Sequence, residues 1–420
     1  MEGAYSGNVA DARPAVASPR EEDGGNQDER TPLLHDPEGA KEQEEGEEAK
    51  KVPGLKAFAA RVSNFISHPT PRDIDDESLK QCYEPNKLAT FRVFFQYTGT
   101  VLQNHVLWKE TISTFLIYIF VVVSFRFVRW DGFKAFVGKE STIRAFVLMF
   151  SGLIGLLLSF YTSLNIGRWW AMRLGVQELW SGACKLTAML ANGVTTDEKL
   201  LHAVHRYARC SLFLVYAANQ KIKDPIQTCV KRGILREDEA DQLELLGGQG
   251  TFAQASAPWA WLTNAVSTLH KQGLTMGPPH LVCLLTAVDQ GRSGVNTIQT
   301  YLETPIPMAY LHVLGLMVKL HNAFVATFYG LICVMHWGGS LGTNEVAIAR
   351  TIFRAFFMPF LYNALLLINA DLTNPFDGDV GDLSFAQFDE CISREATVLI
   401  AASAHRPAWM EGRSYAAWQP

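Results

Sequence analysis

Residues 145–170 read AFVLMFSGLIGLLLSFYTSLNIGRWW, and this stretch decides the kind of fold. Its first 22 residues, 145–166, carry no charge and lie between Arg144 and Arg168. An α-helix rises about 1.5 Å per residue, so about 20 apolar residues cross the hydrocarbon layer of a membrane. The stretch therefore predicts a membrane-spanning helix.

Three more apolar segments of similar length occur at 111–128, 306–337 and 355–372. Residues 168–305 separate the second of the four segments from the third, and they combine mixed charge with helical periodicity. No stretch shows the alternation that is typical of half-buried strands. The sequence predicts an all-α membrane protein with four transmembrane helices and a helical part outside the membrane.

The charges are distributed unevenly along the 420 residues. Only 19% of the residues are charged, whereas about a quarter is usual in soluble proteins. Residues 1–50 hold 14 Asp and Glu against 5 Lys and Arg, and the rest of the chain holds 28 against 32. This pattern excludes a uniformly soluble enzyme and a nucleic-acid binder with a basic face. The seven cysteines occur singly, without a CxxC pair, which favours reduced thiols over a zinc site or a disulfide framework.

The acidic segment 1–50 has neither the apolar core of a signal peptide nor the Arg- and Ser-rich composition of a transit peptide. With few apolar residues it is expected to be a disordered tail. Within it, Glu29 stands four residues before Leu33 and Leu34, a spacing that resembles the acidic dileucine signal bound by clathrin adaptors. Chance explains such a short pattern equally well. As a signal it would favour an endosomal, lysosomal or vacuolar membrane, with the plasma membrane as the alternative.

Residues 51–67 place apolar side chains at helical spacing, with lysine and arginine off that face. This pattern predicts a short basic amphipathic helix, which would rest on a membrane surface or dock on the protein. Three prolines in 68–88 then indicate a linker. The predicted organisation is a tail over 1–50, this helix and linker over 51–90, a core over 91–385 and a C-terminal tail over 386–420.

Four motifs occur in a fixed order along the predicted core. They are SFYTSLNIGRWW at 159–170, PWAW at 258–261, Ile-Pro at 306–307 and NPFDGDVGD at 374–382. Together they strongly resemble the bestrophin family over about residues 97–390. The resemblance implies a homopentameric, calcium-activated anion channel with both termini in the cytosol.

The resemblance also implies a pore neck on the second predicted span. Gly152, Leu156 and Phe160 are four residues apart, so they lie on one stripe of the helix. Symmetric copies would form apolar rings that gate by dewetting. The alternative is ordinary packing between helices. The family usually has three bulky residues in this stripe, so Gly152 and Leu156 predict a wider outer neck.

Asp379 and Asp382 match the two carboxylates of the bestrophin calcium clasp, and Asn374 opens the same motif. Carboxylates three residues apart on a glycine-containing turn can converge on calcium, with carbonyl oxygens completing the ligands. A solvated acidic turn is the alternative. Gly378 and Gly381 interrupt the continuous acidic run of the family, which puts calcium affinity in doubt.

The resemblance also implies a lower aperture before the third span, and counting back from Pro307 places it near Pro279 and His280. Proline suits the first turn of a helix, and a ring of histidines would respond to pH near neutrality. His321 and Lys319, inside the third span, are expected to pack within the bundle. His202 and His205 have no acidic partner in register and are interpreted as surface residues.

The sequence shows no hydrolase triad, nucleotide-binding loop or histidine box, so an enzyme is not expected. The predicted function is an anion channel for chloride, and for bicarbonate as a further candidate, embedded in a lipid bilayer and gated by cytosolic calcium. A calcium-independent channel of the same fold and a non-conducting membrane scaffold are the alternatives.

Overall fold

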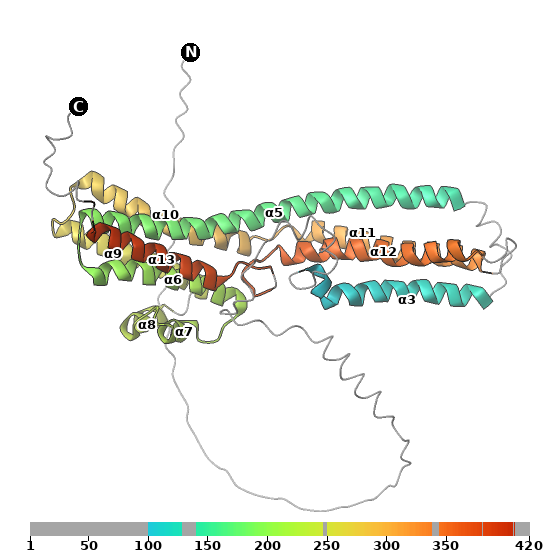
Figure 1. Ribbon diagram of the computed structural model, residues 1–420, viewed down its shortest axis with the longest axis horizontal. Coiled ribbons are helices and arrows are strands. Elements are labelled where there is room, and N and C mark those ends of the chain that lie inside the picture. The colour runs from blue at the N-terminus through green and yellow to red at the C-terminus, as the bar shows by residue number, and fades with distance from the viewer. Residues whose placement is uncertain are drawn as a thin grey trace, which may run out of the picture. The chain divides into compact units, whose positions relative to one another are not determined.

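The computed structural model describes residues 100–127, 140–246, 250–337, 344–379, 381–405 and 407. All of them belong to one compact unit, Phe58–Pro420. The dileucine pattern at Glu29, Leu33 and Leu34 and the basic helix at 51–67 lie outside the described residues. Throughout the described part the regular elements are helices, with no strand, which confirms the all-α fold (Figure 1).

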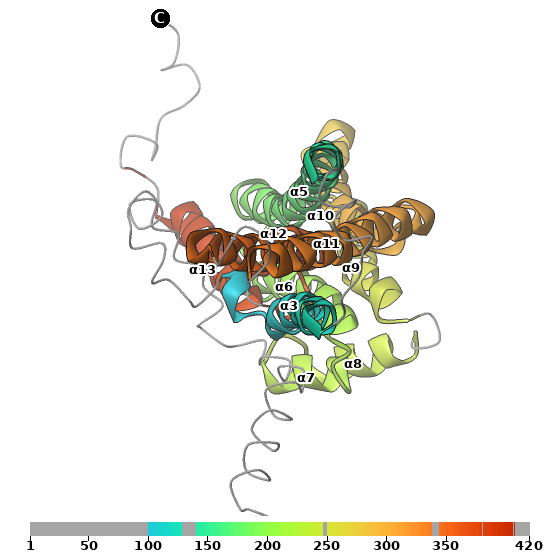
Figure 2. The ribbon, with the colours of Figure 1, turned by 90° about the vertical axis from the view of Figure 1, so that its right-hand side faces the viewer.

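Four helices are long and apolar enough to cross a membrane, as predicted. They are α3 (His105–Phe127), α5 (Glu140–Gly193), α11 (Met308–His336) and α12 (Glu345–Asp371). Viewed end-on, α11 and α12 lie between α3 and α5 (Figure 2), and both middle helices contact both outer ones.

The second helix is much longer than the apolar segment that predicted it. The apolar run ends at residue 166, but α5 continues to Gly193 and comprises 54 residues. Nothing in 167–193 breaks a helix, because this stretch contains no proline, and Gly175 and Gly182 lie where a neighbouring helix approaches closely. A Cβ atom at Gly182 would lie 2.5 Å from the backbone nitrogen of Gly291 on the adjacent helix. Hydropathy alone therefore marks the end of the apolar run and not the end of this helix.

The fourth helix also begins earlier than expected, at Glu345 and not near residue 355. The side chain of Asn344 caps it by accepting a hydrogen bond from the Ala347 backbone N–H at 3.0 Å. Arg350 and Arg354 lower the hydropathy of these first turns without interrupting the helix.

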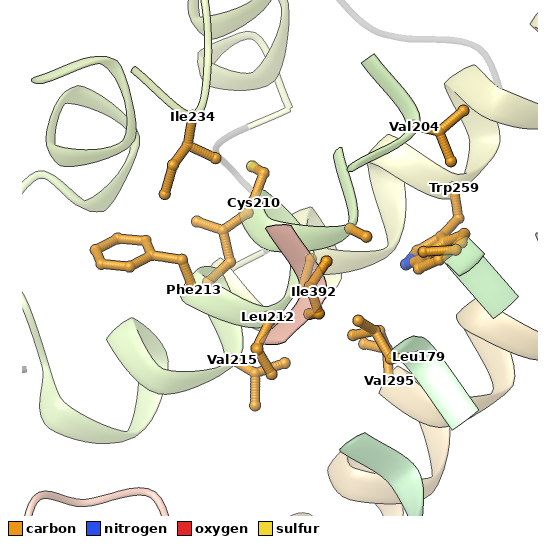
Figure 3. Close-up of a cluster of buried hydrophobic side chains, with 14 of the residues drawn as sticks. Leu179, Val204, Cys210, Leu212, Phe213, Val215, Ile234, Trp259, Val295 and Ile392 are labelled. Atoms are coloured by element: carbon orange, nitrogen blue, oxygen red, sulfur yellow. The ribbon is translucent and has the colours of Figure 1, made fainter. Parts of the chain in front are cut away.

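The second half of α5 packs with six further helices into one core, which we call the extramembrane core. These helices are α6 (Glu198–Gln220), α7 (Pro225–Lys231), α8 (Glu237–Glu244), α9 (Thr251–Lys271), α10 (Pro278–Glu303) and α13 (Phe385–Ala404). Figure 3 shows part of it, with Leu179 of α5 beside Val295 of α10. The short 3₁₀ helix η3 (Val101–Gln103) precedes α3.

The PWAW motif explains how closely these helices approach. Trp259 is completely buried, and its indole N–H donates to the Ser211 hydroxyl at 3.0 Å. Its ring lies over Gly291, where an added Cβ would be only 2.1 Å from the indole. The glycine thus creates the space that the tryptophan fills.

Two expectations about the extramembrane core were wrong. Residues 386–404, predicted as part of a tail, form most of α13, and this helix buries Phe388, Ile392 and Ala396. His205, interpreted as a surface residue, is only 5% exposed, and its Nε2 lies 3.3 Å from the Thr187 hydroxyl on α5. Its neighbours on α6 turn it inward, since Val204 and Ala208 are buried as well.

Candidate functional site

The membrane half of α5 has two different faces. Ile154, Leu158 and Tyr161 are buried and pack against Leu314 and Val318 of α11. The predicted neck residues lie on the opposite face. Each residue advances about 100° around the helix axis, so positions 152, 156 and 160 point away from positions 154, 158 and 161. α5 therefore uses one face to join the bundle and leaves the other uncovered within a single chain.

All three predicted neck residues belong to this uncovered face. Leu156 is 54% exposed and Phe160 is 58% exposed. A Cβ atom at Gly152 would meet no described atom within 4 Å. The face continues over further exposed apolar side chains, at Leu148, Met149, Leu153 and Leu164. Such a face suits lipid, a second copy of the chain or the wall of an apolar pore.

The described residues of the motif, 374–379 and 381–382, form a compact loop shortly after α12, which we call the carboxylate loop. Asp382 is buried, and its Oδ2 accepts hydrogen bonds from the backbone N–H groups of Gly378 at 2.8 Å and Asp379 at 2.9 Å. Asp379 is exposed. The glycines at 378 and 381 adopt positive φ angles of 97° and 123°, which allow the chain to fold back on itself. The loop thus brings the Asp379 backbone against the Asp382 carboxylate, while the Asp379 side chain stays exposed.

Asn374 has a structural role in the same loop. Its Oδ1 accepts from the Phe376 N–H at 3.2 Å, and its Nδ2 donates to Oδ1 of Asn219 on α6, also at 3.2 Å. Asn374 therefore shapes the start of the loop and fastens it to the extramembrane core.

A third carboxylate, Asp377, was not selected from the sequence as a site residue. Its Oδ1 is buried and has no hydrogen-bond partner in the described part of the chain. Burial raises the pKa of Asp377, and the charge of Asp379 adds to this. Burial also raises the pKa of Asp382 to about 9, and repulsion from Asp377 contributes. Crowded carboxylates with an unused buried oxygen are a donor set that suits a hard cation.

The side chains alone do not complete a metal site. Over the residues described, no group of three or more His, Cys, Asp and Glu side chains is arranged to hold a metal ion. Calcium takes six to eight oxygen ligands, so backbone carbonyls and water would have to supply most of them. The fit is that of a partial site built on two or three carboxylates.

The residues predicted to form a lower aperture lie at the start of α10. Pro279 is exposed, and His280 is half-buried. The Met276 backbone N–H donates to His280 Nδ1 at 3.3 Å, and the ring faces Gly193, the last residue of α5. The aperture residues are thus at one end of α5, and the neck residues are in its other half.

His321 packs within the bundle, as expected, whereas the Lys319 side chain is 44% exposed and reaches neighbouring helices only through its ammonium group. His321 is fully buried, and its Nε2 lies 3.0 Å from the Ser151 hydroxyl on α5. Lys319 donates to Glu110 Oε2 on α3 at 2.8 Å and to Asn363 Oδ1 on α12 at 3.1 Å. These contacts join helices through polar groups in an apolar surrounding.

Four membrane-length helices, one of which continues into a helical extramembrane core, define a multi-span, all-helical membrane protein. Residues 80–400 match the family described as "Bestrophin, RFP-TM, chloride channel". Since this match covers most of the sequence, the chain belongs to the bestrophin family.

The relatives agree with this assignment. Human Bestrophin-2a is 22% identical over 282 residues, which are 66% of this chain and 54% of the relative, so the chain spans about half the length of that protein. A mutant of a bacterial bestrophin homologue from Klebsiella pneumoniae has a TM-score of 0.55 at 16% identity, over 69% of this chain and 99% of the homologue. A crystal structure described as a membrane protein has a TM-score of 0.57 at 15% identity, over 72% of this chain and all of that one. At such identities the structures establish the fold alone.

Proposed function

We propose that this protein is an anion channel, with chloride as the first candidate and bicarbonate as the second. The uncovered stripe of Gly152, Leu156 and Phe160 on α5 is the observation that carries the proposal, together with the description of the family as a chloride channel. Symmetric copies of this stripe would surround a narrow apolar passage, in which an anion sheds part of its hydration shell. The positive edges of the Phe160 rings would face the ion.

The pore requires several copies of the chain, and five is the number that the family resemblance implies. A shared axial pore calls for a closed ring, because only a ring covers the same face of every subunit. The uncovered face of α5 is the surface that a ring would bury or turn toward the passage. Pro279 and His280 would then line a second constriction at the far end of α5.

Calcium is the proposed regulatory ligand, held by Asp379 and Asp382. Asp377 would add a third carboxylate, and Asn374 would keep the loop in place. When bound, the ion would supply positive charge that offsets the repulsion between these carboxylates. The chain itself contributes the folded loop. Gly378 and Gly381 permit the backbone conformation of this loop, and the hydrogen bonds accepted by the Asp382 carboxylate hold it closed.

A calcium-independent anion channel is the second candidate. One oxygen of Asp382 already accepts two backbone hydrogen bonds, so the loop has a stable closed form without a cation. Asp382 would then be a structural residue, comparable with a helix-capping aspartate.

The experiment that separates the two candidates is current through a planar bilayer that contains the purified protein. A chloride gradient is applied, and calcium is raised from nanomolar to millimolar. We expect reversal near the chloride potential, with a current that calcium switches on. Asp379→Asn combined with Asp382→Asn should abolish the calcium response, whereas Asp289→Asn, an exposed residue on α10, should not change it.

The remaining outcomes are equally informative. An anion current that ignores calcium would establish the second candidate. No current from folded, oligomeric protein would contradict the channel and leave the scaffold interpretation.

A further inference from the structure

A buried amide contact joins α5 to α12 near the end of the uncharged segment of α5. Asn165 and Asn369 are both fully buried. Asn165 Nδ2 donates to Asn369 Oδ1 at 3.0 Å and to the Asn369 backbone oxygen at 3.2 Å. In return, Asn369 Nδ2 donates to the Thr162 hydroxyl at 2.8 Å. Each helix therefore donates to the other.

Packing does not require this contact. Burying an amide costs free energy even when it is hydrogen-bonded, and two leucines would fill such a place without that cost. The contact is also incomplete, because Asn165 Oδ1 is buried without a partner among the residues that the structure describes. Polar side chains that persist in an apolar span are commonly functional.

The contact lies between the two parts of the proposed channel. On α5, Thr162 and Asn165 follow Phe160 by two and five residues, so they lie within the next turn and a half. On α12, Asn369 lies two residues before the end of the helix and five before Asn374, where the carboxylate loop begins. Thr373, next to that loop, donates from its hydroxyl to the Asn369 backbone oxygen at 2.9 Å. Hydrogen bonds thus connect the loop end of α12 with the neck segment of α5.

We propose that Asn165 and Asn369 are positioning residues that transmit changes in the carboxylate loop to the neck at Phe160. This inference rests on the proposed channel function. A hydrogen bond weakens steeply when its angle or length changes, whereas an apolar contact lets two helices slide. A shift of the loop end of α12 is therefore passed to α5 through the amides and changes how Phe160 projects.

The test is a double-mutant cycle on chloride flux from liposomes that contain the full chain. Asp382→Asn perturbs the loop, and Asn165→Leu removes the contact while keeping the number and branching of the side-chain heavy atoms. In the wild-type background we expect the loop substitution to change flux at least fivefold. In the Asn165→Leu background it should change flux less than twofold, and Asn369→Leu should act in the same way.

Tyr118→Phe provides the matched control. Tyr118 on α3 and Thr351 on α12 share another buried hydrogen bond between membrane helices, with 3.4 Å between the two oxygens. Its loss is expected to leave the fivefold effect of the loop substitution intact. If Asn165→Leu does not assemble, Asn165→Ser replaces it, because serine is too short to reach Asn369.

Three outcomes would overturn the inference while the channel function stands. These are a loop effect that survives Asn165→Leu, a loop effect that Tyr118→Phe also removes, and a wild-type flux that ignores the loop substitution. A wild-type protein that is folded but conducts no anion would overturn the proposed function itself, and the inference with it.

Discussion

The extramembrane core and the membrane helices bury their apolar residues in different ways. In the core, Phe213, Tyr216 and Trp259 are almost completely enclosed by helices of the same chain. In the membrane half of α5, Met149 is 68% exposed and Phe160 is 58% exposed. Of the most apolar 18-residue stretch of each helix, 61% is buried in α11 and only 17% in α5.

A single chain therefore buries the apolar side chains of the extramembrane core but leaves those on the outer face of α5 exposed. The extramembrane core is closely packed like the interior of a soluble protein, so a larger side chain there contacts its neighbours. The outer face of α5 depends on lipid, on other copies or on the pore for its surroundings. Four predictions, in order of decreasing effect on stability, test this difference between the extramembrane core and the outer face of α5.

Two glycines on opposite sides of the contrast should respond differently to one methyl group. Gly291→Ala places a Cβ 2.1 Å from the Trp259 ring, which overpacks the core at a cost of at least about 3 kcal/mol. Gly152→Ala meets open space and should change stability by less than about 0.5 kcal/mol. Thermal unfolding of both variants in detergent is the measurement. Equal shifts would show that the two regions do not differ.

The pH dependence of the core should come partly from His205. Burial lowers the pKa of His205 to about 4, and the nearby positive charges of His202 and Arg209 contribute. Between pH 6.5 and 4, His205 is protonated in the unfolded chain but not in the folded chain. The free energy of unfolding therefore falls as pH falls through this window. At pH 5 the loss is about 2 kcal/mol.

His205→Gln, which does not titrate, should remove that part of the pH dependence. Unfolding of wild type and variant at pH 7 and pH 5 gives the comparison. Parallel pH profiles would mean that His205 is protonated as easily in the folded protein as in the unfolded one.

A third substitution compares a partly buried ion pair with an exposed one on the same helix. Arg209 on α6 binds both carboxylate oxygens of Asp389 on α13, at 2.6 and 2.9 Å, and the two side chains are 24% and 20% exposed. Asp389→Asn is expected to cost about 1–2 kcal/mol, after allowance for partial solvent screening. Glu390→Gln, which affects the more exposed pair with Arg394, should cost less than about 0.5 kcal/mol. Denaturant unfolding measures both, and equal costs would argue against a role for this pair in docking α13.

The smallest effect on stability is expected where the effect on function is largest. Phe160→Ala should change stability by less than about 0.5 kcal/mol, because the ring is mostly exposed. In the proposed channel it should nevertheless increase the flux of large anions relative to chloride, because the proposed ring of phenyl groups is lost. Leu158→Ala on the buried face should instead cost about 2–5 kcal/mol. A severely destabilised Phe160→Ala protein would place Phe160 in a packed interface and not in the passage.

The fold was largely predictable because side chains that face lipid must be apolar, and long apolar segments are easily recognised in a sequence. The boundaries were less predictable. Arg168 ends the apolar run while the helix continues, and Arg350 and Arg354 hide the first turns of α12. The burial of His205 depends on α5 packing against α6, which polarity alone does not reveal.

The candidate site was predictable where its residues are close in sequence. Asp379 and Asp382 share one short loop, so their proximity follows from spacing. The unsatisfied oxygen of Asp377 depends on how the loop folds. The contact of Asn165 with Asn369 joins residues 204 positions apart, although an asparagine in an uncharged span was a visible signal.

The unbroken course of α5 fixes the direction in which the residues of the proposed neck project. The 54 residues form a rod about 81 Å long, and one half of it is immobilised by the extramembrane core. One extra residue in the middle of α5 would turn Phe160 about 100° around the helix axis, off the uncovered face. Seven extra residues, close to two full turns, would nearly restore the direction while lengthening the rod. The direction in which Phe160 projects is thus tied to the packing of the extramembrane core by the register of a single helix.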